Sequence, residues 1–239
     1  MDHSSTASGP AGGAVEAVGM ACPQDAAPHP VARVHIIEAD ANGSCLFTSL
    51  RLGLELHAVL AKHRSGTRVV SACLDGRAPA LLKSAEDLRA MVVQWYADNL
   101  DKEIPGDAPR LKRGDLLAIE MVRHAHDVPV DGPLRTEAIQ KYLAAMRRQG
   151  TWGSTPEYVA FAMMSKLSVK VFQPMGRPNG TSASLGPEVR IVDEVRLDNP
   201  TGSISLLFDG HSHYDLLVVN PEEVRAAWPA ARIAERVFK

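Results

Sequence analysis

The sequence predicts an α+β fold in which helices precede most of the strands. After one early β-branched segment, apolar residues recur at helical spacing through the middle of the chain. From residue 167 onward the pattern changes to alternation with a period of two, which is typical of half-buried strands. Because the helices come first and the strands later, we expect a small mixed or antiparallel sheet packed between helices.

The first third of the chain contains one predicted strand and two predicted helices. Residues 31–39 are rich in β-branched side chains and predict a strand. Ser44 is a suitable N-cap for a helix over 45–57, whose apolar side chains recur at helical spacing. The run Ser84-Ala85-Glu86-Asp87 resembles a capping box and predicts a helix to about residue 99.

Three more helices are predicted before the pattern changes. Residues 116–126 form the first of them, and Thr136 caps the second, which stops at Gly150. Thr155-Pro156 begins the third, with proline at a position that helices tolerate.

The last third of the chain predicts four strands and one short helix. The strands cover 167–172, 188–197, 203–208 and 213–219. Residues 173–186 are rich in Gly, Pro, Ser and Asn and predict a loop, whereas Asp209-Gly210-His211-Ser212 predicts a hairpin turn. The final residues predict a short helix after Pro221 that is broken at Pro229.

The domain organisation follows from composition. Residues 1–30 are mostly Ala, Gly, Ser and Pro and predict a disordered tail. Residues 31–220 predict one domain, and 221–239 a C-terminal short helix and tail. The chain has 239 residues, of which 45% are hydrophobic, so one sizeable core is expected.

Composition also excludes several classes of function. A net charge of −2 gives no electrostatic support for nucleic-acid binding, and no apolar run approaches the roughly 20 residues needed to cross a bilayer. The cysteines Cys22, Cys45 and Cys73 are far apart and form no CxxC pair, so neither disulfides nor a metal site is expected. We therefore expect a reducing compartment, the cytoplasm or the nucleus. A monomer that needs no cofactor is a separate expectation.

Cys45 is the candidate nucleophile because of its position at a predicted helix start. Backbone N–H groups and the positive end of the helix dipole would point at its sulfur and favour the thiolate. Cys73 lacks such a context, and Cys22 lies in the predicted tail. A buried structural cysteine is the alternative interpretation of Cys45.

His213 and Asp215 form a candidate base and orienting carboxylate. Two residues apart on a strand, their side chains share a face, so the carboxylate can bind one imidazole nitrogen and leave the other free. Tyr214 would then point into the packing. His211 is a rival base, but it lies in the predicted turn and lacks an aspartate two positions later.

The turn before Cys45 has the composition of an oxyanion hole. Gly43 permits an unusual φ and a close approach of substrate, and backbone N–H groups of the turn, which includes Ser44, and of Cys45 could face the developing charge. Asn42 could add a donor or brace the loop, and Asp40 is the nearest acidic side chain before it.

Taken together, these motifs resemble the ovarian tumour (OTU) cysteine proteases, a family of deubiquitinases. Asn42-Gly43-Ser44-Cys45-Leu46-Phe47 resembles the element of that family before its first core helix. Thr151-Trp152-Gly153, followed by Glu157, resembles its middle block, and His213-Tyr214-Asp215 resembles its closing block. The three blocks occur in the family's order, and Leu88-Arg89 resembles part of its second helix.

The resemblance implies a papain-like OTU fold and a thiol protease. Cys45 would be the nucleophile, His213 the general base and Asp215 its orienting residue, while Trp152 and Gly153 would flank a narrow substrate channel. The partner would be ubiquitin or polyubiquitin, or a ubiquitin-like modifier. Asn42 departs from the family, which usually has aspartate there, so a catalytically impaired ubiquitin-binding module is a second hypothesis. A cysteine hydrolase or acyltransferase acting on another modifier or a small amide is a third.

Overall fold

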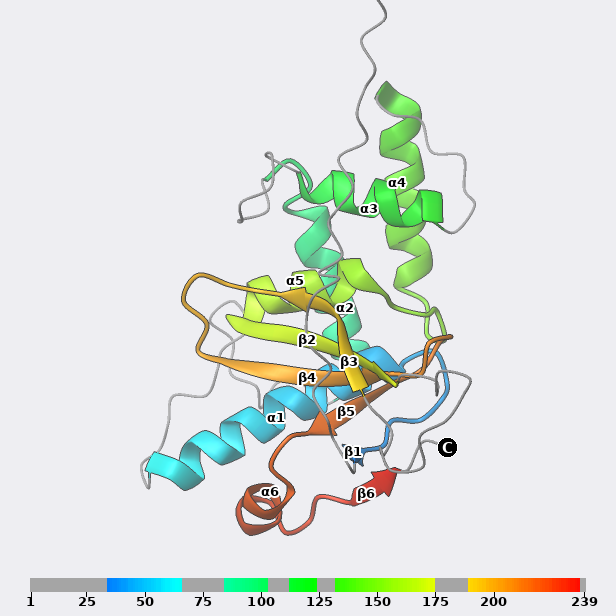
Figure 1. Cartoon of the computed structure of the whole chain (residues 1–239). Helices are drawn as coiled ribbons and strands as arrows, with labels where there is room; N and C mark the ends of the chain where they lie inside the picture. The colour runs from blue at the N-terminus through cyan, green and yellow to red at the C-terminus, as the bar shows by residue number, and fades with distance from the viewer. Residues whose placement is uncertain (1–33, 66–83, 103–111, 124–131, 175–188, 237–239) are drawn as a thin grey trace, which may run out of the picture.

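The computed structural model describes residues 34–65, 84–102, 112–123, 132–174 and 189–236. The predicted tail over 1–30, Cys22, Cys73 and most of the predicted loop over 173–186 lie outside these ranges. Within them the chain forms six helices and six strands. The prediction of an α+β fold is confirmed (Figure 1).

The strands form one mixed sheet in the order β3-β2-β4-β5-β1-β6. β2 and β4 are parallel, and every other neighbouring pair is antiparallel. The bounds are β1 Val34–Ile37, β2 Leu167–Pro174, β3 Val189–Val195, β4 Gly202–Phe208, β5 Tyr214–Val218 and β6 Ile233–Arg236. β4 and β5 form the predicted hairpin, with Gly210 at a φ of 91° in the connection.

The helices are α1 Cys45–Ser65, α2 Ala85–Ala97, α3 Arg113–Arg123, α4 Gly132–Met146, α5 Thr155–Ser165 and α6 Pro221–Ala227. α1 packs on β4 and β5, and α5 packs on β2, with α2 against both helices (Figure 1). Their apolar side chains share one core with one face of the sheet. The alternate strand residues, including Val34, Ile36 and Leu217, form a smaller cluster on the other face. In the described part of the chain, the helices therefore cover one face of the sheet rather than both.

Helix starts follow the sequence signals except in α3, which begins at Arg113 rather than at the predicted residue 116, and in α4. Ser84 and Asp87 form the predicted capping box of α2. The box of α5 is formed by Ser154 and Glu157, one residue before the predicted start. The prediction that Thr136 caps a helix is wrong, because α4 already begins at Gly132 and Thr136 lies inside it.

The C-terminal segment contains a strand in addition to the predicted short helix. α6 occupies the predicted position, but the chain then continues into β6, which pairs antiparallel with β1 at the edge of the sheet. β1 is thereby enclosed between β5 and β6. This pairing brings the last described residue, Arg236, onto the strands that carry the candidate site.

Candidate active site

The first residue of α1, Cys45, lies against the segment that leads into β5. Its Sγ is 3.7 Å from the carbonyl oxygen of Ser212, the residue before His213. One turn later, the hydroxyl of Ser49 donates to the carbonyl of Tyr214 at 3.0 Å. Two contacts thus join the start of α1 to both neighbours of His213, residues more than 160 positions away in the sequence.

The protonation state of Cys45 differs from the sequence prediction. The thiol is 1% exposed, and burial raises its pKa above the ordinary value. Backbone amides of Tyr214, Leu46 and Cys45 itself act in the opposite direction, as a helix start should, but they do not outweigh burial. The expectation of a favoured thiolate is therefore wrong for this arrangement, which holds a protonated thiol.

His213 lies immediately before β5 and is held by Asp215. Its Nε2 is 3.0 Å from Oδ1 of Asp215. Its Nδ1 is buried and has no hydrogen-bond partner among the described residues. The carboxylate therefore fixes the imidazole through one nitrogen and leaves the other without a competing partner. Tyr214 points away, into the core, where its ring stacks on Phe208.

Asp215 is a buried carboxylate with three donors. It is 1% exposed and accepts the backbone N–H of Ala39 at 3.0 Å as well as the contact from His213. Its second oxygen accepts a hydrogen bond from Nη1 of Arg236 at 2.6 Å. The sequence reasoning missed Arg236, because nothing local to residue 236 indicates that β6 pairs with β1.

Side chain and backbone brace the loop before Cys45. Oδ1 of Asn42 accepts the backbone N–H of Ser44 at 3.0 Å, and the N–H of Asn42 donates to the carbonyl of Asp40 at 2.9 Å. The amide of Ser44 is therefore already engaged, so Ser44 supports the loop rather than offering an oxyanion donor. The side chain of Asp40 is exposed, so of the two residues Asn42 provides the side-chain acceptor that braces the loop.

The backbone at position 43 requires glycine. Its φ is +77°, and a Cβ built on it would lie 2.2 Å from the carbonyl oxygen of Gly150. The loop that carries the nucleophile therefore lies directly on the loop that follows α4.

A buried guanidinium joins these two loops. Arg89 of α2 is 1% exposed and donates to the carbonyl of Gly43 at 2.9 Å and to that of Thr151 at 2.7 Å. It also donates to Oγ of Ser44 at 3.1 Å and lies 4.3 Å from the ring centre of Phe47. The sequence singled out Arg89 only by resemblance, and its burial was the information that the sequence lacked.

The two residues predicted to flank the substrate channel, Trp152 and Gly153, differ in their exposure to solvent. Trp152 is 47% exposed, which is unusual for a side chain of its size. A Cβ on Gly153 would lie 2.8 Å from a methyl group of Leu46 and 3.1 Å from the ring of Phe47. Gly153 thus permits close packing on α1, and Trp152 beside it is available to a ligand.

Glu157, from the same sequence block, has a structural role. Burial raises its pKa to about 7, although the N–H of Ser154 and the hydroxyl of Tyr142 donate to it and partly offset this effect. It caps α5 and is not among the residues that contact Cys45 or His213.

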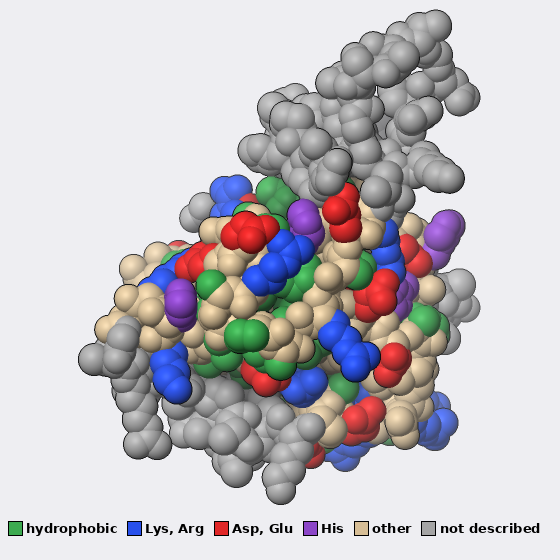
Figure 2. Space-filling view, turned by 90° about the horizontal axis from the view of Figure 1, so that it is seen from below, with side chains coloured by type: hydrophobic (Ala, Val, Ile, Leu, Met, Phe, Trp, Pro, Cys, Tyr) green, Lys and Arg blue, Asp and Glu red, His purple; other side chains and the backbone are tan. Residues whose placement is uncertain are grey.

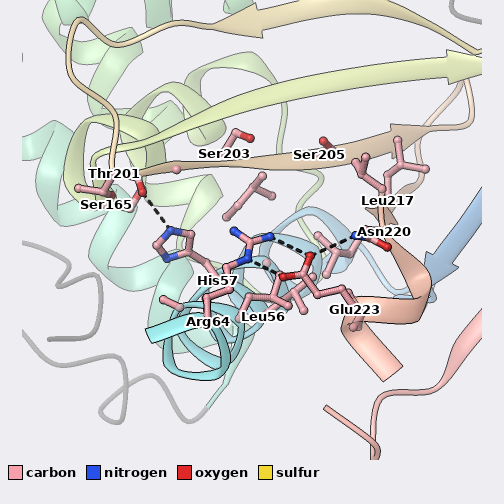
Figure 3. Close-up of a pocket in the computed structure, with 18 of the residues that line it drawn as sticks. Leu56, His57, Arg64, Ser165, Thr201, Ser203, Ser205, Leu217, Asn220 and Glu223 are labelled. Carbon is pink, nitrogen blue, oxygen red and sulfur yellow. Dashed lines mark hydrogen bonds and ion pairs between the residues drawn. The ribbon is translucent and has the colours of Figure 1, made fainter. Parts of the chain in front are cut away.

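A cavity of about 930 Å³ lies elsewhere, between the second half of α1, the start of β4, the end of β5 and α6. As Figure 3 shows, Nε2 of His57 contacts the carbonyl oxygen of Thr201 at 3.2 Å in its lining, and Arg64 forms a two-bond ion pair with Glu223. None of Cys45, His213 and Asp215 lines it.

The face seen from below mixes acidic and basic side chains around hydrophobic ones, without a continuous basic surface in the view of Figure 2.

The described residues contain no group of three or more His, Cys, Asp or Glu side chains that could hold a metal ion. Among the helices that the structure describes, none is both long and apolar enough to cross a membrane.

Comparison with known proteins gives structural likeness only. No family model and no curated protein matches the sequence. An OTU deubiquitinase from Wolbachia pipientis wMel is 17% identical, with 83% of this chain and 98% of that chain covered and a TM-score of 0.42. The OTU domain protease of Farallon virus is 10% identical (79% and 86% covered, TM-score 0.43), and the Hazara virus OTU bound to ubiquitin is 17% identical (78% and 81%, TM-score 0.35). This likeness assigns no residue of the chain a role.

Proposed function

We propose that the chain is a deubiquitinase that hydrolyses isopeptide bonds at the ubiquitin C-terminus through a thioester on Cys45. The observation that supports this proposal best is that Cys45 lies beside the segment that carries His213 and Asp215. The sulfur of Cys45 lies against the residue before His213, whose Nε2 is held by Asp215 and whose Nδ1 is unpartnered. The choice of ubiquitin rests on the three sequence blocks that resemble the OTU family.

In this proposal, Nδ1 of His213 takes the proton of the Cys45 thiol as sulfur attacks the carbonyl carbon of the substrate. Since burial keeps the thiol protonated at rest, the proton is transferred during attack rather than before substrate binds. Asp215 stabilises the imidazolium, which then protonates the leaving lysine amine. Water, deprotonated by the same imidazole, hydrolyses the thioester.

A second candidate function, ubiquitin binding without turnover, is favoured by one observation. Cys45 is almost fully buried and its pKa is raised, which is the opposite of what an activated thiol shows. In that case the same surface would hold the ubiquitin tail, and the thiol would stay inert.

A ubiquitin probe with a C-terminal electrophile separates the two candidates. We expect a covalent adduct, seen as a mass increase of one ubiquitin, that disappears in Cys45→Ala. The double variant Cys22→Ser, Cys73→Ser is the matched control and should be labelled like the natural chain. Binding without an adduct would overturn the hydrolase in favour of the binding module.

Cleavage of di-ubiquitin then tests turnover itself. We expect hydrolysis that is lost in Cys45→Ala and His213→Ala and strongly reduced in Asp215→Ala. Probes built on ubiquitin-like modifiers, used in parallel, test the choice of modifier. Preferential labelling by one of them would replace ubiquitin as the substrate.

A further inference from the structure

The carboxylate of Asp215 is shared between the imidazole and a guanidinium from the far end of the chain. Oδ1 is 3.0 Å from Nε2 of His213, and Oδ2 accepts Nη1 of Arg236 at 2.6 Å. Arg236 also donates to Oε1 of Glu38 through Nη2, at 3.2 Å. The side chain of Arg236 is 34% exposed, whereas that of Asp215 is 1% exposed. The guanidinium therefore lies on the solvent side of the carboxylate.

Arg236 reaches this position only because β6 is docked. β1 separates β5, which carries Asp215, from β6, which carries Arg236. The guanidinium must therefore cross β1, and its place depends on the register in which Arg236 pairs with Val34.

We infer that Arg236 is a positioning residue for the pair His213–Asp215, a role that rests on the proposed function. It satisfies the second oxygen of a buried carboxylate, which would otherwise carry an uncompensated charge. It thereby holds the first oxygen in line with the imidazole. It also places a positive charge on the carboxylate that contacts the imidazole.

The groups around the pair come from several elements. Cys45 of α1 lies against Ser212, and Asp209 of the β4–β5 turn accepts the backbone N–H groups of His211, Ser212 and His213. Burial alone would raise the pKa of Asp209, but these amides and His213 lower it, so this carboxylate is charged at neutral pH. Glu38, just after β1, and Arg236 itself add one negative and one positive charge beside the pair.

The experiment follows the imidazole of His213 by NMR as a function of pH in the full chain, with the signal assigned by its loss in His213→Gln. In Arg236→Gln the midpoint of this titration should rise by about 0.5 to 1 pH unit, because a close positive charge is removed. Arg232→Gln is the matched control: it makes the same charge change at an exposed position on the same segment, and should leave the midpoint in place. An unchanged or lowered midpoint in Arg236→Gln would overturn the inference.

Two further variants test whether Arg236 acts on His213 through the carboxylate of Asp215. Arg236→Lys keeps the charge and should return the midpoint close to that of the natural chain. In an Asp215→Asn background, Arg236→Gln should shift the midpoint by less than half of its effect in the natural chain, since the route through the carboxylate is gone. A shift of equal size in both backgrounds would show that Arg236 acts on His213 independently of Asp215, and would overturn the inference.

The titration uses no ubiquitin, so its outcome is separate from that of the proposed function. A shifted midpoint in a chain that cleaves no ubiquitin conjugate would refute the deubiquitinase and retain the role of Arg236. An active deubiquitinase with an unshifted midpoint would do the reverse.

Discussion

The guanidinium of Arg89 donates to the carbonyl oxygen of Gly43, two residues before Cys45, at a distance of 2.9 Å. A second nitrogen of the same group donates to Thr151 at 2.7 Å. One buried cation thus joins the loop before the nucleophile to the loop before Trp152. Burial lowers the pKa of Arg89, and the nearby carboxylates of Glu157 and Glu86 oppose that shift.

Arg89→Met should destabilise the protein and slow labelling by the electrophilic probe. Four oxygen acceptors would lose their donor, and we expect a loss of about 2–4 kcal/mol in the free energy of unfolding. Urea denaturation measures it. The control is Arg51→Met, which removes an exposed pair with Glu55 and should cost about 0.5 kcal/mol or less. Equal effects of the two substitutions would contradict the bracing role of Arg89.

Asn42→Asp should leave kcat/KM for di-ubiquitin within about threefold, a change of less than 1 kcal/mol. Oδ1 of Asn42 braces the loop by accepting the N–H of Ser44, and a carboxylate oxygen accepts the same bond. Asn42→Ala removes the acceptor and should lower kcat/KM by about tenfold, for the loss of one hydrogen bond. If Asn42→Asp instead raised the rate more than tenfold, the missing negative charge would be what limits activity.

Stability should fall as pH rises from about 5 to 8 because of Glu157. Its pKa is raised from an ordinary 4.5 to about 7 in the folded chain, so the protonated form is favoured by folding. The stabilisation is complete below about pH 4.5 and is lost as pH passes through 7, by about 3 kcal/mol at most. Glu157→Gln, which keeps an acceptor for Ser154, should flatten the profile measured by urea denaturation. A slope that persists in Glu157→Gln would assign it to another group.

Cys45 should react slowly with iodoacetamide at neutral pH when no substrate is bound. Burial both hides the sulfur and raises its pKa, so the rate of alkylation should increase steeply as pH rises above the range of an ordinary thiol. Mass spectrometry in the Cys22→Ser, Cys73→Ser background measures it. Rapid alkylation near pH 6 would contradict a protonated resting thiol.

The sequence predicted most of what depends on local pattern. The start of α1 at Cys45, the capping box at Ser84 and the hairpin before β5 follow from helix caps and turn residues. β6 escaped prediction because Ile233–Arg236 is only four residues long and follows Pro229, and because its partner β1 lies at the other end of the described chain. The protonation state of Cys45 was predicted wrongly for a different reason. A helix start, with its dipole and free amides, can be predicted from the sequence, whereas the extent of burial is set by packing.

The absence of a side chain at Gly43 has a mechanical consequence. With the carbonyl of Gly150 pressed against its α-carbon, the two loops cannot slide past each other or separate without losing the ties to Arg89. The loop before Cys45 and the loop before Trp152 therefore form one packed unit, so a substitution that displaces either loop should displace the other as well.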